Sequence, residues 1–225
     1  MSTIILSDIH ANLQAVLALR PMIGEAELVV CLGDFTGYYC EVNEVLDFIR
    51  GLPATLCVRG NHDQFVLSEC PREAPEAVRF GVEYARRVIE PGHRRWLENL
   101  PLLWGGMIGS RSALLVHGSP FAPLTGYLYQ DEIRKARVDD FDFDLIAFGQ
   151  THRPLMMAGQ PTLVNPGAVG QSRNQPAVAC AAWFDPDSMS IDLLALPYDP
   201  QPVIDLARRH GAGPWITKHL VAAPA

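Results

Sequence analysis

The sequence has little positive charge and almost no lysine. Its 225 residues include 18 Lys and Arg against 25 Asp and Glu, a formal net charge of −7, and only 2 of the basic residues are lysines. A protein that wraps long nucleic acid presents a basic face, so this charge balance argues against such a partner. It leaves a small phosphate compound open as a ligand, because a bound metal ion supplies local positive charge whatever the net charge is.

Long hydrophobic runs, paired cysteines and glycine-rich phosphate loops are also missing. No apolar run approaches the ~18 residues of a membrane span, so we expect no membrane partner. The five cysteines form no Cys-x-x-Cys pair, which favours reduced thiols in a cytoplasmic protein. The N-terminus has no basic stretch or cleavage site of the kind that marks a targeting signal. The absence of Gly-x-Gly-x-x-Gly after the first apolar run argues against a dinucleotide-dependent oxidoreductase.

What is present has the composition of an ordinary globular protein, with 48% hydrophobic and 19% charged residues. No repeat, low-complexity tract or linker interrupts the chain, so we expect a single domain over 1–225. The opening part reads strand–helix–strand–helix–strand, which is typical of a parallel sheet in an α/β protein. The expected strands are 4–6, 28–32, 55–58, 113–116, 145–148, 154–158, 162–164, 177–184 and 191–196. The expected helices are 13–20, 41–49, 78–89, a short one about Trp96, and 204–210. We expect the C-terminal residues 221–225 to fray.

Side chains that can bind metal stand at the ends of five of these strands. In open α/β sheets, ligands bind beyond the carboxyl ends of the strands, so residues far apart in sequence converge there. Asp8 and His10 lie two positions apart and therefore project to the same side of an extended segment. Asp34 follows a glycine that permits a sharp turn, and its carboxylate has two oxygens that can bridge two cations. The residues are Asp8 with His10, Asp34, Asn61 with His62, His117 and His152.

This set offers carboxylate, amide and imidazole donors but no thiolate. Mixed oxygen and nitrogen donors suit Mn²⁺, Fe²⁺, Zn²⁺ or Ni²⁺ better than a structural zinc. Taken alone, Asp-x-His, Gly-Asp and His-Gly are ordinary features of solvated turns. The run Gly60-Asn61-His62-Asp63 is more specific, because these three polar residues after a strand have no packing reason.

Taken in order, these blocks resemble the calcineurin-like metallophosphoesterase superfamily, in particular its compact bacterial phosphodiesterase-like branch. The blocks of that family are Asp-x-His, Gly-Asp, Gly-Asn-His-Asp/Glu, a strand-end His, and Gly-His-x-His. The resemblance implies a four-layer α/β/β/α sandwich, in which helices flank two central sheets. The matching residues are Asp8-Ile9-His10, Gly33-Asp34, Gly60-Asn61-His62-Asp63, His117 and Gly149-Gln150-Thr151-His152, and the similarity continues through 165–171 and 197–199.

The resemblance implies two divalent metal ions, with manganese favoured over iron, zinc or nickel. The first ion would bind Asp8, His10, Asp34 and His152, and the second would share Asp34 and add Asn61 and His117. Gln150 occupies the place of the first histidine in Gly-His-x-His, and its neutral amide oxygen is a poorer ligand for most transition metals than imidazole. We therefore expect the second site to bind metal more weakly, or to prefer a harder ion such as Mn²⁺.

The implied activity is hydrolysis of a small phosphate ester, with a phosphodiesterase favoured. A phosphomonoesterase and a catalytically weak binding scaffold of the same fold are the alternatives. Two cations would clamp the phosphate and lower the pKa of a shared water. His62 lies outside the ligand set and is expected beside the leaving group, as acid or charge stabiliser, or else as a hydrogen-bonding neighbour of a ligand. Asn61, His62, Arg173 and Tyr38 are the candidates for substrate contact, although a structural ion pair is equally expected for Arg173.

The remaining polar residues are expected to have structural roles. We expect Asp63 to organise its loop and Asn12 to cap the first helix. His93, His210 and His219 are expected at the surface. The residues after Gly33-Asp34 lack the Val-Asp-Arg-Gly sequence of protein phosphatases, which argues against a phosphoprotein substrate. The sequence leaves open whether the protein associates with itself.

Overall fold

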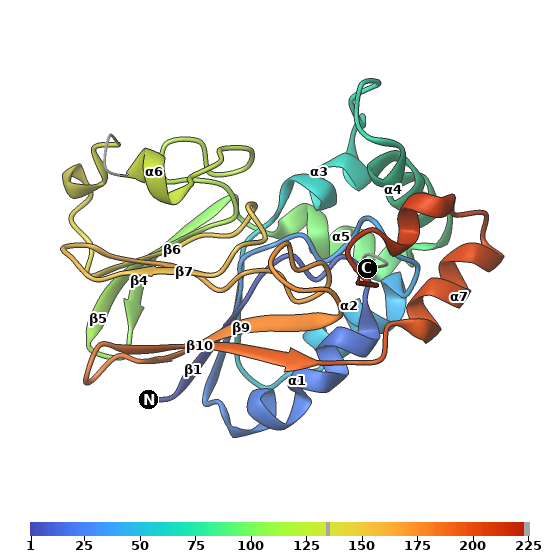
Figure 1. Cartoon of the computed structure of the whole chain (residues 1–225). Coiled ribbons are helices and arrows are strands. Elements are labelled where there is room, and N and C mark those ends of the chain that lie inside the picture. The colour runs from blue at the N-terminus through green and yellow to red at the C-terminus, as the bar shows by residue number, and fades with distance from the viewer. Residues whose placement is uncertain (134–135, 223–225) are drawn as a thin grey trace.

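Two five-stranded sheets stack between layers of helix in the computed structural model, which describes residues 1–133 and 136–222 (Figure 1). The first sheet has the order β10-β9-β1-β2-β3, and the second has the order β4-β5-β6-β8-β7. Strands β1, β2 and β3 run parallel, as do β5, β6 and β8, whereas β9, β10, β4 and β7 pair antiparallel to their neighbours. Both sheets are therefore mixed, and each has a parallel part.

The strand bounds lie close to the expected ones. The first sheet contains β1 (Thr3–Leu6), β2 (Leu28–Cys31), β3 (Thr55–Cys57), β9 (Val178–Asp185) and β10 (Ser190–Pro197). The second sheet contains β4 (Leu103–Ile108), β5 (Arg111–Val116), β6 (Leu145–Ala147), β7 (Leu155–Met157) and β8 (Thr162–Asn165). Strand β4 was not expected, because two glycines and exposed apolar side chains hide its pattern.

The helices are α1 (Leu13–Glu25), α2 (Val42–Arg50), α3 (Asn61–Leu67), α4 (Glu76–Val88), α5 (Pro91–Asn99), α6 (Gln130–Ile133) and α7 (Gln201–Arg209), with two 3₁₀ turns, η1 (Val138–Asp140) and η2 (Pro214–Thr217). In Figure 1, α1 and α2 lie against the first sheet, α7 lies beyond the end of β10, and α6 lies beside the second sheet. Among the described residues, no helix combines the length and the apolar character that crossing a membrane requires.

Alternating side chains of the strands separate three apolar clusters, and so define four layers. In β1, Ile4 and Leu6 pack with the helices, while Ile5 points into the cluster between the sheets. In β5, Leu115 joins the cluster between the sheets, while Leu114 packs with residues of α6 and η1 on the outer side. The order helix, sheet, sheet, helix is the expected α/β/β/α sandwich.

One local prediction about the helices was wrong, and one helix that holds site residues was not expected. Helix α1 does not end near Pro21 but includes it, because the buried face formed by residues such as Leu19 and Ile23 continues past the proline. Helix α3 was not among the expected helices, and Asn61 and His62 form its first turn. Residues 223–225 of the tail that was expected to fray lie outside the described residues.

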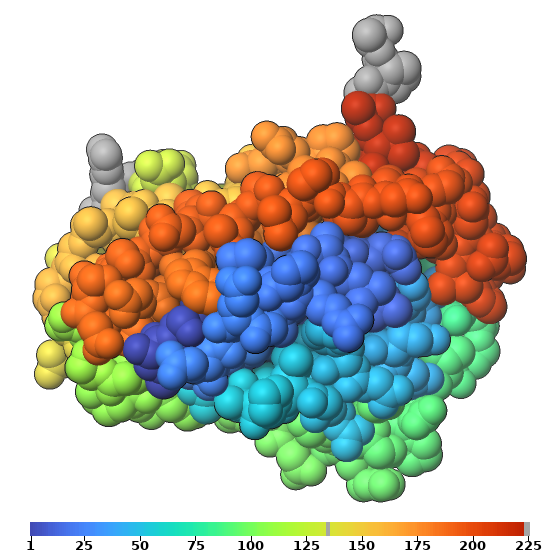
Figure 2. Space-filling view, turned by 90° about the horizontal axis from the view of Figure 1, so that it is seen from below, coloured from blue at the N-terminus to red at the C-terminus, as the bar shows by residue number. Residues whose placement is uncertain are grey.

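The first helix is capped as predicted. The Asn12 side-chain oxygen accepts a hydrogen bond from the backbone N–H of Ala15 at 3.1 Å. Its amide nitrogen donates to the carbonyl of Gly170 and to the hydroxyl of Tyr198, both at 2.9 Å. Seen from below, α1 lies alongside the C-terminal strands and α7 (Figure 2). Asn12 therefore joins the beginning of the chain to its C-terminal third.

Candidate metal centre

The metal-capable residues of both sheets meet at the carboxyl ends of five parallel strands. Asp8 and His10 follow β1, Asp34 follows β2, and Asn61 begins α3 just after β3. From the second sheet, His117 directly follows β5 and His152 comes shortly after β6. All of these residues are buried. The predicted convergence is therefore present across the two sheets, as the rule for strand ends requires.

The ligand atoms form two neighbouring groups that share Asp34. Oδ1 of Asp8 lies 3.2 Å from Nε2 of His152 and 3.8 Å from Nε2 of His10. Oδ2 of Asp34 lies 3.8 Å from Nε2 of His10 and 3.4 Å from Nε2 of His117. The triplets Asp8–His10–His152, Asp8–Asp34–His117 and His10–Asp34–His62 each have their ligand atoms within 4.8 Å of one another.

Three of the imidazole rings are held so that Nε2 faces the centre. The Nδ1–H groups of His10, His117 and His152 donate to the backbone carbonyls of Thr36, Leu32 and Gln171, at 3.0, 2.9 and 2.8 Å. A proton fixed on Nδ1 leaves a lone pair on Nε2, which is the arrangement of histidines that bind metal.

Acceptor atoms consequently face one another without a proton between them. The Nε2 atoms of His10 and His152 are 3.1 Å apart, and Oδ1 of Asp8 has no hydrogen-bond partner among the described residues. Burial, and then the neighbouring imidazoles His62 and His152, hold the pKa of His10 well below its usual range. Protonation therefore does not relieve the contact between the lone pairs. A divalent cation does, so the residues present fit a metal ion.

The pKa values of the two carboxyl groups shift in opposite directions. Burial raises the pKa of Asp8, but interactions with His152, and then with His117 and His10, outweigh burial and leave the pKa well below its usual range. Burial, and then the nearby charges of Asp63 and Asp8, raise the pKa of Asp34 well above its usual range. A cation beside Asp34 would offset this repulsion and favour the carboxylate form.

The backbone is strained at the candidate ligands. Asp8, His10, Asp34, Gln150 and His152 have φ values of 54°, 54°, 56°, 64° and 58°. Residues other than glycine rarely adopt this left-handed region, and such strain concentrates at functional sites. The surrounding hydrogen bonds must therefore hold these side chains in place against the preferences of the backbone.

Asp63 provides much of this support, as predicted. Its carboxylate accepts hydrogen bonds from the backbone N–H groups of Asp34, Thr36 and Gly60 at 2.9, 3.0 and 3.1 Å, and from the Thr36 hydroxyl at 3.0 Å. Asp63 is fully buried. It thereby ties the loop that follows β2 to the start of α3.

We expect Asp63→Ala to lower the free energy of unfolding by about 3 kcal/mol or more, because several buried donors lose their acceptor together. Chemical denaturation of the metal-free protein measures this. Asp192→Asn, an exposed position in β10, serves as the control and should change the stability little. If Asp63→Ala lowered the free energy of unfolding by less than about 1 kcal/mol, the carboxylate would not stabilise the loop that follows β2.

His62 stands beside the centre with its ring outside the closest contacts. Its backbone N–H donates to Oδ1 of Asp34 at 2.8 Å, while its Nε2 lies 3.9 Å from Oδ2 of the same carboxylate. The ring of Tyr38 stacks on it, with the centroids 4.9 Å apart. Gly37 has φ +92°, and a Cβ there would come within 2.3 Å of the His62 ring. Burial, and then His152 and His117, lower the pKa of His62 to about 3, so the ring is neutral in the free protein.

The other predicted site residues lie around the same centre. The backbone N–H of Gln150 donates to Oδ2 of Asp8 at 3.2 Å. The buried Oε1 of the Gln150 side chain has no hydrogen-bond partner in the part of the chain that the structure describes. Arg173 is exposed, and its backbone N–H donates to the carbonyl of His152 at 3.2 Å. Within residues 1–133 and 136–222, Arg173 forms none of the structural ion pairs that were considered for it.

His93, His210 and His219 were predicted to lie at the surface, and this prediction is confirmed for His210 but wrong for the other two. His210 is exposed. His93 is buried, because its Nδ1 accepts a hydrogen bond from Nη1 of Arg50 at 2.7 Å and its ring is enclosed at the base of α5. His219 is half-buried and, with Trp215, lines a cavity next to the metal centre. Neither residue belongs to a motif block: His93 lies between the block at 60–63 and His117, and His219 lies after the last block.

The chain is similar to known proteins over nearly its whole length. The family model described as the calcineurin-like phosphoesterase superfamily domain matches residues 1–188. An uncharacterised protein of Methanocaldococcus jannaschii, MJ0912, is 28% identical over 239 residues, which cover 96% of this chain and 96% of that protein. The crystal structure of a metallophosphoesterase from Sphaerobacter thermophilus is 28% identical, with a TM-score of 0.85 and coverage of 98% of each chain. The hypothetical protein PH1004 from Pyrococcus horikoshii OT3 has the same fold at 21% identity, with a TM-score of 0.81 and coverage of 99% of each chain.

Proposed function

Because the chain belongs to the calcineurin-like phosphoesterase superfamily, we propose that it is a phosphodiesterase that uses two divalent metal ions to hydrolyse a small phosphate ester. One observation carries this proposal: two buried groups of ligand atoms meet at the Asp34 side chain, and the lone pairs on Nε2 of His10 and His152 face each other at 3.1 Å. We place the protein in the cytoplasm, which the five free cysteines support.

The proposed ligands divide between the two ions as follows. Asp8, His10, Asp34 and His152 would hold the first, and Asp34, Asn61, His117 and Gln150 would hold the second. The second set is richer in oxygen donors, which favours manganese over iron, zinc or nickel. Two cations held there would supply a water of lowered pKa and offset the charge that develops on the phosphoryl oxygens.

The chain's own residues would position the ester. His62 and Asn61 lie side by side in the first turn of α3, next to Asp34, and can contact the phosphate or the leaving oxygen. The Tyr38 ring stacks on His62 and meets the edge of His10 at 4.6 Å between centroids, so it limits how His62 can move. The exposed guanidinium of Arg173 is available to a phosphate oxygen.

We expect Gln150→His to raise the affinity of the second metal site by about ten-fold or more, because an imidazole is the better ligand for most transition metals. Calorimetric titration of Mn²⁺ and Zn²⁺ into the metal-stripped protein measures both affinity and preference. Gln160→His, near the turn before β8, is the matched control at an exposed glutamine. If Gln150→His left both affinity and preference unchanged, Gln150 would not be a ligand.

The diester preference is tested by comparing bis(4-nitrophenyl) phosphate with 4-nitrophenyl phosphate on the manganese-loaded protein. The proposal predicts a higher kcat/KM for the diester. A higher value for the monoester would make the protein a phosphomonoesterase. The absence of turnover with either compound, in protein that is folded and binds manganese, would favour a binding scaffold of the same fold.

A further inference from the structure

A cavity of about 300 Å³ opens beside the metal centre, within the size range of small-molecule sites. It shares a wall with the centre: Tyr38 lines the cavity and also contacts the rings of His62 and His10. Gln171 lines it too, and the Gln171 carbonyl accepts the hydrogen bond from Nδ1 of His152. The cavity therefore adjoins the metal centre, with Tyr38 and Gln171 between them.

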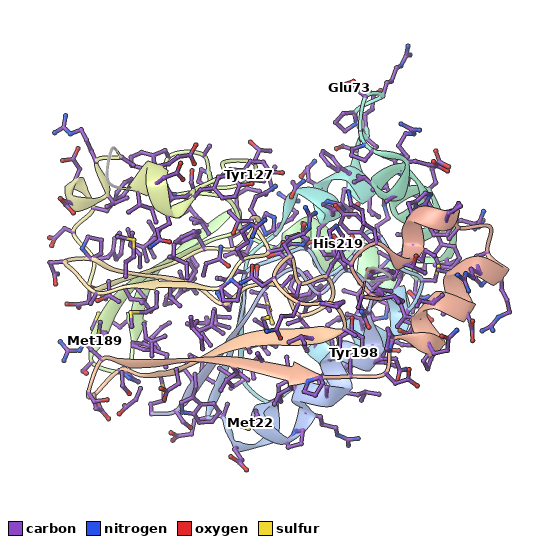
Figure 3. The ribbon with its side chains drawn as sticks, viewed as in Figure 1. Met22, Glu73, Tyr127, Met189, Tyr198 and His219 are labelled. Atoms are coloured by element: carbon purple, nitrogen blue, oxygen red, sulfur yellow. The ribbon has the colours of Figure 1, made fainter. Side chains whose placement is uncertain are left out.

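The outer wall of the cavity comes from the C-terminal segment. Trp215, Lys218 and His219 lie on or just after η2, beyond the residues 1–188 that the family model matches. In Figure 3, His219 lies near the middle of the view, on the segment that follows α7. One wall of the cavity is therefore built by a part of this chain that the family model does not match.

One side of the cavity is aromatic. Tyr38, Tyr39 and Trp215 line it. The Trp215 indole is fixed by an edge contact with Phe80, with the ring centroids 5.2 Å apart. Flat, rigid side chains such as these stack on the ring of a ligand at low cost in conformational entropy.

The other side holds two cationic side chains, Arg173 and Lys218, next to His219, whose pKa is lowered to about 4 by burial and then by Arg173 and Lys218. Arg173, Lys218 and His219 line both this cavity and an adjoining hollow, so they form a ridge between the two. Lys218 and Arg173 are exposed, and over the part of the chain that the structure describes neither forms an ion pair. Glu76 is the carboxylate among the lining residues. Two unpaired cations side by side in a protein of net charge −7 are typical of a site that binds an anion.

We propose that this cavity selects the substrate: it binds one ester group of the phosphodiester, and that group carries a flat ring and a second anionic group. The ring would stack among the aromatic residues, and Lys218 with Arg173 would bind the second anion. The proposal rests on the proposed function, because the ester is the one hydrolysed at the metal centre.

Two matched substrates test it. Thymidine 5′-(4-nitrophenyl phosphate) has the ring alone, and its 3′-phosphorylated form adds a second anion at the other end of the sugar. Wild-type protein should hydrolyse the 3′-phosphorylated form with a kcat/KM about ten-fold higher or more, and Lys218→Ala should lower that preference about ten-fold. Lys218→Arg should keep it, as should Arg20→Ala, an exposed cation on α1.

Binding without turnover gives the second measurement. Thymidine 3′,5′-bisphosphate should bind to the metal-stripped wild-type protein in calorimetry, and Lys218→Ala should raise its Kd about ten-fold. Equal hydrolysis of the two substrates, or equal binding by wild type and Lys218→Ala, would overturn the role of the cavity. Turnover of bis(4-nitrophenyl) phosphate separates the two claims: its absence contradicts the proposed function, whereas its presence without a preference contradicts the substrate selection alone.

Discussion

Asp34→Asn should lower kcat/KM for bis(4-nitrophenyl) phosphate by at least ~10³-fold. The Asp34 carboxylate is the group shared by both sets of ligand atoms, with Oδ2 at 3.8 Å from Nε2 of His10 and 3.4 Å from Nε2 of His117. An amide has one oxygen acceptor and no negative charge, so it cannot bridge two cations. Steady-state turnover at saturating Mn²⁺ measures the loss.

This substitution should spare the fold. Burial, and then the charges of Asp63 and Asp8, raise the pKa of Asp34 well above its usual range, so a neutral side chain of the same shape is tolerated in the metal-free protein. The thermal midpoint of the metal-free variant should therefore match that of the wild type. Asp192→Asn is the control for the loss of one carboxylate. Turnover by Asp34→Asn within about ten-fold of wild type would exclude a shared bridging ligand.

His62→Ala is expected to reduce turnover by roughly 10²–10⁴-fold, the typical contribution of a positioned acid, without loss of metal affinity. The ring lies 3.9 Å from Oδ2 of Asp34 but outside the closest ligand contacts. It is neutral in the free protein, with a pKa of about 3, and an anionic phosphate beside it would favour the protonated form. Aryl phosphodiesters that differ in leaving-group pKa measure the effect, which should be largest for the poorest leaving groups.

His210→Ala, at an exposed position after α7, controls for the removal of a histidine. Equal losses by His62→Ala across all leaving groups would contradict the acid role and leave charge stabilisation. A lower metal affinity would assign His62 to the ligands, since it also forms a triplet with His10 and Asp34. The two measurements together therefore decide which role His62 has.

The positions of the site residues could be predicted because of where they stand in the sequence. Each follows a short apolar run, and the carboxyl ends of parallel strands meet at one edge, so Asp8, Asp34 and His117 were expected together. Helix-cap preference placed Asn12 at the start of the first helix, and Asp63, expected to organise its loop, does so from the first turn of α3. The prediction of four layers came from the family resemblance, because periodicity alone does not reveal which face of a strand packs against the other sheet.

Features that depend on long-range contacts could not be predicted. Strand β4 contains two glycines, and its pairing with β5 decides its conformation more than its composition does. Pro21 stays inside α1 because burial of Leu19 and Ile23 outweighs the hydrogen bond lost at the proline. The left-handed φ of His152 and the burial of His93 depend on neighbours distant in sequence, and so does the cavity wall formed by Trp215.

The most direct test of the account is a titration of Mn²⁺ into metal-stripped protein, with bound metal and hydrolysis of bis(4-nitrophenyl) phosphate measured at each step. If two ions share Asp34 and the second binds more weakly through Gln150, two equivalents of Mn²⁺ should bind. Turnover should then rise mainly as the second equivalent binds. Full turnover with one equivalent, or two bound equivalents without turnover, would contradict the proposed two-metal phosphodiesterase.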